Sequence, residues 1–75
     1  MTIFALLQRS AELVASDSAL LDTELLLCLA LGVDRAYLKT WPDRWPNTEQ
    51  LNAFHGYFQR RLRGEPIAYI LGWQG

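Results

Sequence analysis

The sequence predicts an all-α fold, a small five-helix bundle with the second helix buried at its centre. Two observations support this class directly, and a third excludes the main alternative. Apolar residues recur at intervals of three and four, which is the spacing of one helical face. Residues that start and stop helices divide the chain into five such segments. No stretch shows the apolar–polar alternation that a half-buried strand requires.

The first two helices are predicted from caps and apolar spacing. The first is expected to begin after Thr2, whose hydroxyl can accept a hydrogen bond from a free backbone N–H group. Its buried face is predicted to contain the apolar residues Ile3, Leu6, Leu7, Ala11 and Val14. The second covers Ala19–Leu31, after the capping run Ser16-Asp17-Ser18. It is apolar on every side from Leu25 onward, which predicts a central position, and Gly32 is expected to end it.

The third and fourth helices are likewise predicted from their caps, from helix-breaking residues and from apolar spacing. The third is predicted from an N-cap at Asp34 to about Thr40, before two prolines interrupt the helical pattern. The fourth covers Thr48–Arg63 and begins with Asn47 and Gln50 at the spacing of a capping box. Its apolar stripe is the clearest in the chain and consists of Leu51, Phe54, His55, Phe58 and Leu62.

A short fifth helix completes the predicted bundle. Gly64 can stop the fourth helix, since glycine adopts the left-handed conformation of helix ends. Pro66 fits the first position of a helix that extends to Leu71, and Gly72 follows as its terminator.

Length and composition limit what such a bundle can do. The chain has 75 residues, 51% of them hydrophobic and 20% charged, which excludes intrinsic disorder. It is too short for a doubly wound nucleotide-binding domain. A core of this size is viable but marginal, with little volume to spare for an active-site cavity. We therefore expect one domain that does no chemistry alone.

The net charge, the single cysteine and the lengths of the apolar runs argue against several further classes of protein. The net charge is −1, which gives no global attraction to nucleic acid or anionic membrane. Cys28 is the sole cysteine, so an internal disulfide is excluded and a buried, inert thiol is predicted. The longest apolar run, Leu25–Leu31, is far shorter than a membrane span. With no signal peptide in view, a cytoplasmic location is expected.

No pattern predicts a catalytic, metal or phosphate site. His55 is the one histidine, and its place on an apolar stripe favours a packed structural role at the edge of the core. Asp22 and Glu24 lie two positions apart on a helix and point away from each other, so they cannot share a proton. The glycines form neither a dinucleotide fingerprint nor a phosphate loop.

A helix-turn-helix DNA-binding module is an alternative interpretation of the middle of the chain. The small, glycine and apolar residues between Cys28 and Trp41 partly match the spacing of such a unit. The would-be recognition helix offers only Arg35 and Lys39 for contacts with DNA. The preceding helix is apolar all round, whereas a helix next to DNA needs a solvated face. Both features weigh against DNA binding.

Two groups of side chains are candidates for contact with a partner. The basic group at the end of the fourth helix either only complements the helix dipole or meets a protein or RNA: Arg60, Arg61 and Arg63. Tryptophans in or beside predicted loops either fill the core or anchor a contact: Trp41, Trp45 and Trp73. Both interpretations of each group are open at this point.

Two stretches carry a more specific pattern than helical spacing. The first is Leu21-Asp22-Thr23-Glu24-Leu25-Leu26-Leu27 with Leu31-Gly32. The second is Arg60-Arg61 with Gly64-Glu65-Pro66-Ile67-Ala68-Tyr69-Ile70-Leu71-Gly72. With Pro42-Asp43 between them, they resemble the N-terminal domain of the HemK/PrmC family, over essentially the whole chain and in the same order.

The resemblance implies a parent enzyme that uses S-adenosylmethionine to methylate a glutamine side-chain nitrogen in class-1 peptide chain release factors. This family joins a small helical N-terminal domain to a Rossmann-like catalytic domain, which agrees with the five-helix prediction. Its Asn-Pro-Pro-Tyr motif and its glycine-rich cofactor loop are both absent here. We therefore expect no catalytic, cofactor-binding or metal-binding residue in this chain.

The resemblance also implies that different parts of the chain have different roles. Residues 1–72 are expected to recruit the release factor, and residues 73–75 to begin the connector to a catalytic domain in cis. The expected contact residues are Arg60, Arg61, Arg63 and Glu65 for the release factor, and Tyr69 and Trp73 for the junction with the catalytic domain. The alternatives are a freestanding helical protein-interaction or DNA-binding module, and a structural cap that only stabilises the catalytic domain.

Overall fold

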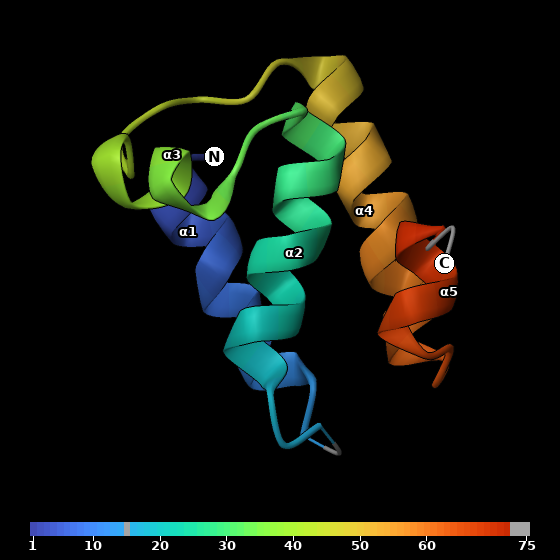
Figure 1. Cartoon of the computed structure of the whole chain (residues 1–75). Helices are drawn as coiled ribbons and strands as arrows, with labels where there is room; N and C mark the ends of the chain where they lie inside the picture. The colour runs from blue at the N-terminus through green and yellow to red at the C-terminus, as the bar shows by residue number, and fades with distance from the viewer. Residues whose placement is uncertain (15, 73–75) are drawn as a thin grey trace.

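The computed structural model describes residues 1–14 and 16–72, which form five α-helices and one 3-10 helix (Figure 1). The elements are α1 (Ile3–Leu7), η1 (Gln8–Glu12), α2 (Ala19–Leu31), α3 (Arg35–Thr40), α4 (Thr48–Leu62) and α5 (Ile67–Leu71). Within these two ranges the backbone forms no strand. The predicted all-α, five-helix architecture is therefore confirmed.

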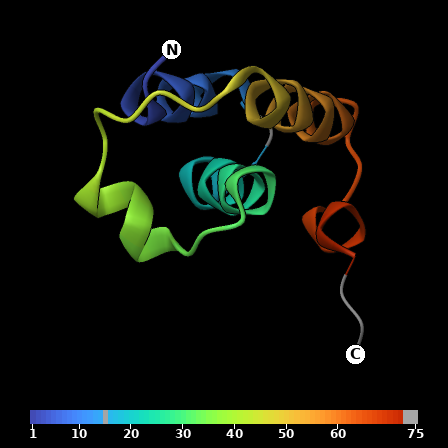
Figure 2. The same ribbon diagram turned by 90° about the horizontal axis from the view of Figure 1, so that it is seen from above.

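The second helix lies at the centre of the bundle, as predicted. Seen from above, α1 and α4 lie on one side of α2, and α3 and α5 flank it (Figure 2). α2 packs against all of these elements and against η1. The side chains of the core come from each of the five α-helices and from Leu13, which follows η1. The α-helical members are Ile3, Leu6, Leu26, Leu27, Leu38, Phe54, Phe58 and Ile70.

The predicted caps at the starts of α1, α3 and α4 form as expected. The Thr2 hydroxyl accepts a hydrogen bond from the backbone N–H three residues later, at 3.1 Å. The Asp34 carboxylate does the same at the start of α3, at 2.9 Å. Asn47 and Gln50 exchange the two bonds of a capping box, at 2.8 and 2.9 Å. These bonds satisfy N–H groups that each helix leaves without a partner in its first turn.

The helix ends also follow the sequence, with two shifts of one residue. α4 ends at Leu62 rather than at the predicted Arg63, which is its C-cap. Gly32 and Gly72 adopt left-handed backbone angles, with φ of 71° and 69°, and end α2 and α5. Pro66 is the N-cap of α5 rather than its first helical residue. α5 therefore begins one residue later than predicted.

The first segment departs from the prediction because it is not one regular helix. After Leu7 the backbone tightens into η1, which has three residues per turn instead of 3.6. The tighter pitch rotates the residues that follow. Leu13 is buried as a result, whereas Val14, predicted on the buried face, is 91% exposed. The predictions for Val14 and for Ala11, which is exposed as well, are wrong for this reason.

The loop between α3 and α4 closes over the start of α1. The backbone N–H of Ile3 donates to the carbonyl oxygen of Arg44 at 2.9 Å, and that of Phe4 donates to the carbonyl oxygen of Pro42 at 3.0 Å. The loop therefore supplies acceptors for two N–H groups at a helix start, where the helix itself supplies none.

One face of α2 is less covered than its composition predicts. Leu29 is 39% exposed although it lies in the fully apolar part of the helix. Cys28, predicted to be buried, is half-buried on the same helix. Burial still raises the pKa of its thiol, so the reactive thiolate is disfavoured, as expected of an inert cysteine.

Two leucines of α2 provide a test of this core. Leu27→Ala should lower the free energy of unfolding by about 2–5 kcal/mol, because the lost methyl groups leave a cavity. Leu20→Ala on the same helix, where the side chain is 53% exposed, should cost less than about 1 kcal/mol. Urea denaturation followed by circular dichroism measures both changes. Equal losses in the two variants would contradict the position of the core.

Candidate functional site

Arg60 and Glu65 form a surface ion pair where α4 meets the turn to α5. The Arg60 guanidinium donates to both carboxylate oxygens of Glu65, with a distance of 3.0 Å from Nε to Oε1. This paired geometry is the strong form of an arginine–carboxylate contact. The shared hydrogen bond raises the pKa of Arg60 and lowers the pKa of Glu65. The two charges neutralise each other at the surface.

Arg61 points inward, toward the carboxylate of Asp22 on α2. Its Nε donates to Oδ2 of Asp22 at 3.1 Å, and its Nη1 donates to the backbone oxygen of Glu65 at 3.4 Å. The Asp22 side chain is only 5% exposed and also accepts hydrogen bonds from the hydroxyls of Ser16 and Ser18, at 2.9 and 3.2 Å. A buried carboxylate requires such compensation. Arg61 therefore ties α2 to α4 and to the turn before α5.

This network explains why α2 begins differently from the prediction. Ser18 is the N-cap, but its side chain makes no hydrogen bond to the backbone of the first turn. Its hydroxyl donates to Asp22 instead. The serines of the predicted capping run thus support a side chain of the helix rather than its free N–H groups.

Arg63 differs from its two neighbours because its charge is exposed. It is the C-cap of α4 and takes part in none of the ion pairs found among residues 1–14 and 16–72. An open hollow of about 150 Å³ lies at this end of α4. It is lined in part by Val14 and by Leu62 and Gly64, the residues before and after Arg63 in the chain. The end of α4 thus combines an exposed cation with exposed apolar side chains, a composition suited to contact with a protein.

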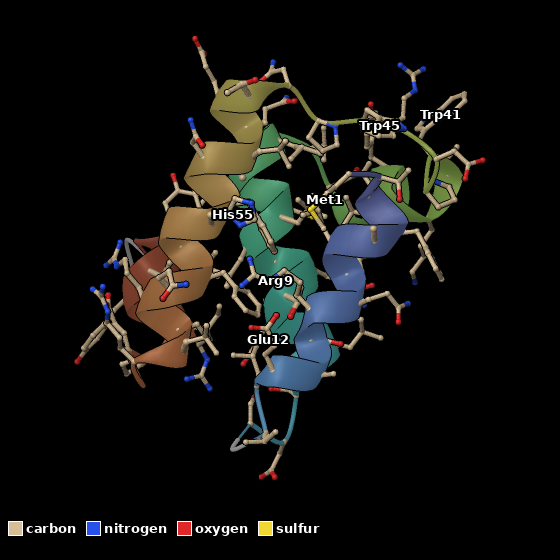
Figure 3. All side chains as sticks on the ribbon, turned by 180° about the vertical axis from the view of Figure 1, so that it is seen from behind. Met1, Arg9, Glu12, Trp41, Trp45 and His55 are labelled. Carbon is tan, nitrogen blue, oxygen red and sulfur yellow. The ribbon has the colours of Figure 1, made fainter. Side chains whose placement is uncertain are left out.

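The residues predicted for the interdomain junction lie at the end of the chain. Tyr69 is on α5 and is 73% exposed, so its ring can meet a further surface. Trp73 lies outside the described residues. The other two tryptophans, Trp41 and Trp45, are exposed in the loop between α3 and α4 (Figure 3), where the guanidinium of Arg44 lies 4.7 Å from the centroid of the Trp41 ring.

Arg9 has a structural role that the sequence interpretation missed. Its guanidinium lies 4.4 Å from the centroid of the Phe58 ring, and its Nη1 lies 2.7 Å from Nδ1 of His55 (Figure 3). Nε of Arg9 donates to Glu12 at 2.8 Å. Because a guanidinium only donates, Nδ1 of His55 is the acceptor and the ring proton is assigned to Nε2. His55 is thus half-buried at the edge of the core, in the structural role predicted for it.

Only part of the signal for Arg9 was present in the sequence, because Arg9 lies three residues after Leu6, which was predicted to be buried. Its second buried neighbour, Leu13, four residues later, is set by the 3-10 turn and was not predicted. A charged residue at this spacing shares the apolar face of its helix, so its side chain must find an acceptor or an aromatic ring there.

One of the two cations that the helix-turn-helix interpretation requires for DNA contact is already paired within the protein. Arg35 lies at the start of α3 and forms an ion pair with Glu24 of α2, with Nη2 to Oε1 at 3.1 Å. Lys39 is then the cation of α3 without such a pair among the described residues. This arrangement favours structural support over contact with DNA phosphates.

The described residues carry none of the usual features of a metal site or a membrane span. They include no group of three or more His, Cys, Asp or Glu side chains that could hold a metal ion. None of their helices is long and apolar enough to cross a bilayer. What they bring together at the end of α4 is an arrangement of ion pairs and apolar side chains, which suits binding.

Comparison with known proteins places the chain in a family. The family model described as the PrmC N-terminal domain matches residues 5–72. The chain belongs to the PrmC N-terminal domain family. The resemblance inferred from the two sequence stretches is thereby confirmed, and the matched range extends from α1 to the end of α5.

Curated relatives of this PrmC N-terminal domain carry the name release factor glutamine methyltransferase. The protein from Pseudomonas aeruginosa is 48% identical over 100% of this chain and 27% of its own length. That from Aliivibrio fischeri is 46% identical over 99% and 27%, and that from Vibrio cholerae is 43% identical over 95% and 26%. The chain thus spans about a quarter of the length of these relatives. No solved structure matches the chain significantly.

The inward position of Arg61 can be separated from a surface role by stability measurements. Arg61→Met should lower the free energy of unfolding by about 1–3 kcal/mol, because Asp22 then lacks its cation in a buried site. Arg63→Met, two residues away and exposed, should change it by less than about 0.5 kcal/mol. Urea denaturation measures both. In a double-mutant cycle with Asp22→Asn, a coupling energy of about 0.5–3 kcal/mol is expected for Arg61, and strict additivity would contradict the contact.

The Arg60–Glu65 pair should make stability depend on acid pH. The hydrogen bond from Arg60 holds the pKa of Glu65 below its ordinary value of 4.5, so the unfolded chain takes up the proton first. The stabilisation is therefore present above pH 4.5 and is lost as the pH falls through the lowered pKa. Glu65→Gln should flatten the fall of the melting temperature below pH 4.5, and Arg60→Gln should flatten it similarly. Parallel curves for wild type and Glu65→Gln would contradict the pair.

Proposed function

We propose that this chain is the N-terminal domain of a release factor glutamine methyltransferase and that it positions the release factor for catalysis. The observation that carries the proposal is the family match over residues 5–72, supported by relatives of that name at up to 48% identity. In this proposal residues 1–72 do no chemistry, and residues 73–75 begin the connector to the catalytic domain. The full-length enzyme acts in the cytoplasm on class-1 peptide chain release factors.

The proposal gives the cofactor S-adenosylmethionine to the catalytic domain in cis, outside this chain. A Rossmann-type site needs a strand that leads through a glycine-rich turn into a helix. The described residues consist of helices joined by turns and loops and do not fit that requirement. We therefore assign none of them to the cofactor.

Positioning has a clear physical value for this reaction. A glutamine side chain on a large protein reacts efficiently only when the protein is held in register with the methyl donor. A second contact surface removes translational and rotational freedom before the chemical step, and such alignment accelerates reactions strongly. The surface must itself be rigid to do so. The ion pair of Arg61 with buried Asp22 supports such rigidity at the end of α4.

We place the contact with the release factor at the end of α4 and the turn after it. Arg63 offers an exposed cation there, and the exposed side chains of Val14 and Leu62 line a hollow at the same end of the helix. Arg60 and Glu65 remain partly exposed as a pair, so a partner can meet both charges. Arg61 contributes from within, since its guanidinium is committed to Asp22 and holds this surface in place.

Arg63→Glu in the full-length enzyme tests this placement. It should raise the KM for intact release factor about three- to tenfold, because a charge at the rim of an interface is reversed. The kcat/KM for a short glutamine-containing peptide should be unchanged, since a peptide reaches only the catalytic domain. Lys39→Glu on α3 is the matched control and should affect neither substrate.

A truncation tests the recruiting role as a whole. An enzyme that lacks residues 1–72 should lose kcat/KM on intact release factor more than on the peptide. A purely structural cap predicts equal losses on both substrates. Unchanged efficiency on intact release factor would contradict recruitment.

A further inference from the structure

α2 carries an apolar stripe on the side that no described helix covers. Its members follow helical spacing along the exposed side of the helix: Leu21, Leu25, Cys28 and Leu29. The side chains of Leu21 and Leu29 are 40% and 39% exposed, and the other two are half-buried. α2 lies in front of α1 and α4 in Figure 1, and seen from above its remaining side lies open between α3 and α5 (Figure 2).

Ion pairs border this α2 stripe on both sides. Toward α3, Glu24 pairs with Arg35 at 3.1 Å. Toward the end of α4, Asp22 pairs with Arg61 at 3.1 Å. An apolar centre with a polar rim is the usual anatomy of a surface that becomes buried in an interface. A helix that is apolar on all sides is normally covered on all sides. The exposed stripe is therefore expected to be covered by a partner.

We propose that the α2 stripe is covered by the catalytic domain of the same chain. This inference rests on the proposed function. α5 packs directly against α2, and it is the last element before Gly72, where the family match ends. In the relatives the matched part is only 27% of the protein, so most of their chain lies outside it. A segment that follows α5 therefore starts at the rim of the stripe.

The chemistry of the stripe favours an intramolecular partner over the substrate. The stripe contains three leucines and a cysteine and no charged side chain. Apolar contacts are typical of permanent interfaces, whereas partners that dissociate in each catalytic cycle use more polar ones. The end of α4 has the mixed composition expected of the second kind. The two faces are therefore assigned to different partners, and the catalytic domain takes the α2 stripe.

Cys28 provides a reporter within the stripe itself. In the full-length protein, its modification by N-ethylmaleimide is followed by peptide mass spectrometry at one fixed pH. The wild-type thiol should react slowly. The double variant Leu21→Gln/Leu29→Gln should expose it and raise the rate at least tenfold. Leu20→Gln is the matched control: it changes an adjacent exposed leucine about 100° away around the helix and should keep the slow rate.

Thermal unfolding of the same full-length proteins gives a second measurement. A docked wild-type protein and Leu20→Gln should each melt in one transition. The double variant should melt in two, because the domains lose their contact while each keeps its own core. Circular dichroism at low temperature checks that the helices are intact.

Three outcomes would overturn the proposal. Fast labelling of Cys28 in the wild-type enzyme would show an uncovered stripe. Labelling that becomes slow only after addition of release factor would show that the substrate covers the stripe. Labelling that becomes slow only at high protein concentration would show that a second copy of the protein covers it. The proposed function is tested separately by the KM of Arg63→Glu, so either idea can fail while the other stands.

Discussion

The carboxylate of Asp22 holds the separate parts of this bundle in one arrangement. It is buried on α2, where it accepts hydrogen bonds from the loop before the helix and from Arg61 at the end of α4. The guanidinium of Arg61 also donates a hydrogen bond to the backbone oxygen of Glu65. This bond fixes the turn before α5 relative to α2. Apolar packing is non-directional and does not by itself fix how the helices are oriented relative to one another. The hydrogen bonds and the ion pair of Asp22 do have a preferred geometry and fix that orientation. The candidate contact surface is built on this frame.

The small size of the chain explains why its two exposed faces differ. Among the described residues, the other four α-helices and η1 cover α2 on most sides and leave one side open. Small domains bury a smaller fraction of their surface than large ones do. The open side is apolar. The end of α4, by contrast, is charged and lies at a helix terminus, where cations are favoured by the helix dipole. A domain of this size can thus serve a permanent and a transient partner with different chemistry.

Most of the fold was predictable from the sequence because its signals are local. The caps at Asp34 and at Asn47 with Gln50 depend on residues no more than three apart. The position of Leu13 and Val14 was not predictable from regular spacing, because a 3-10 turn changes the pitch. A helical pattern assumes that the pitch is constant.

The candidate site was only partly predictable, for a different reason. The three arginines at the end of α4 look equivalent in the sequence. The fold separates them: Arg60 meets a neighbour in the next turn, Arg61 meets a carboxylate from α2, and Arg63 meets solvent. Only the first of these contacts is local. The closure of α1 by the carbonyl groups of Pro42 and Arg44 is equally distant in sequence. During synthesis α1 emerges before this loop, so the N–H groups of Ile3 and Phe4 gain these protein acceptors only after residues 42–44 have followed.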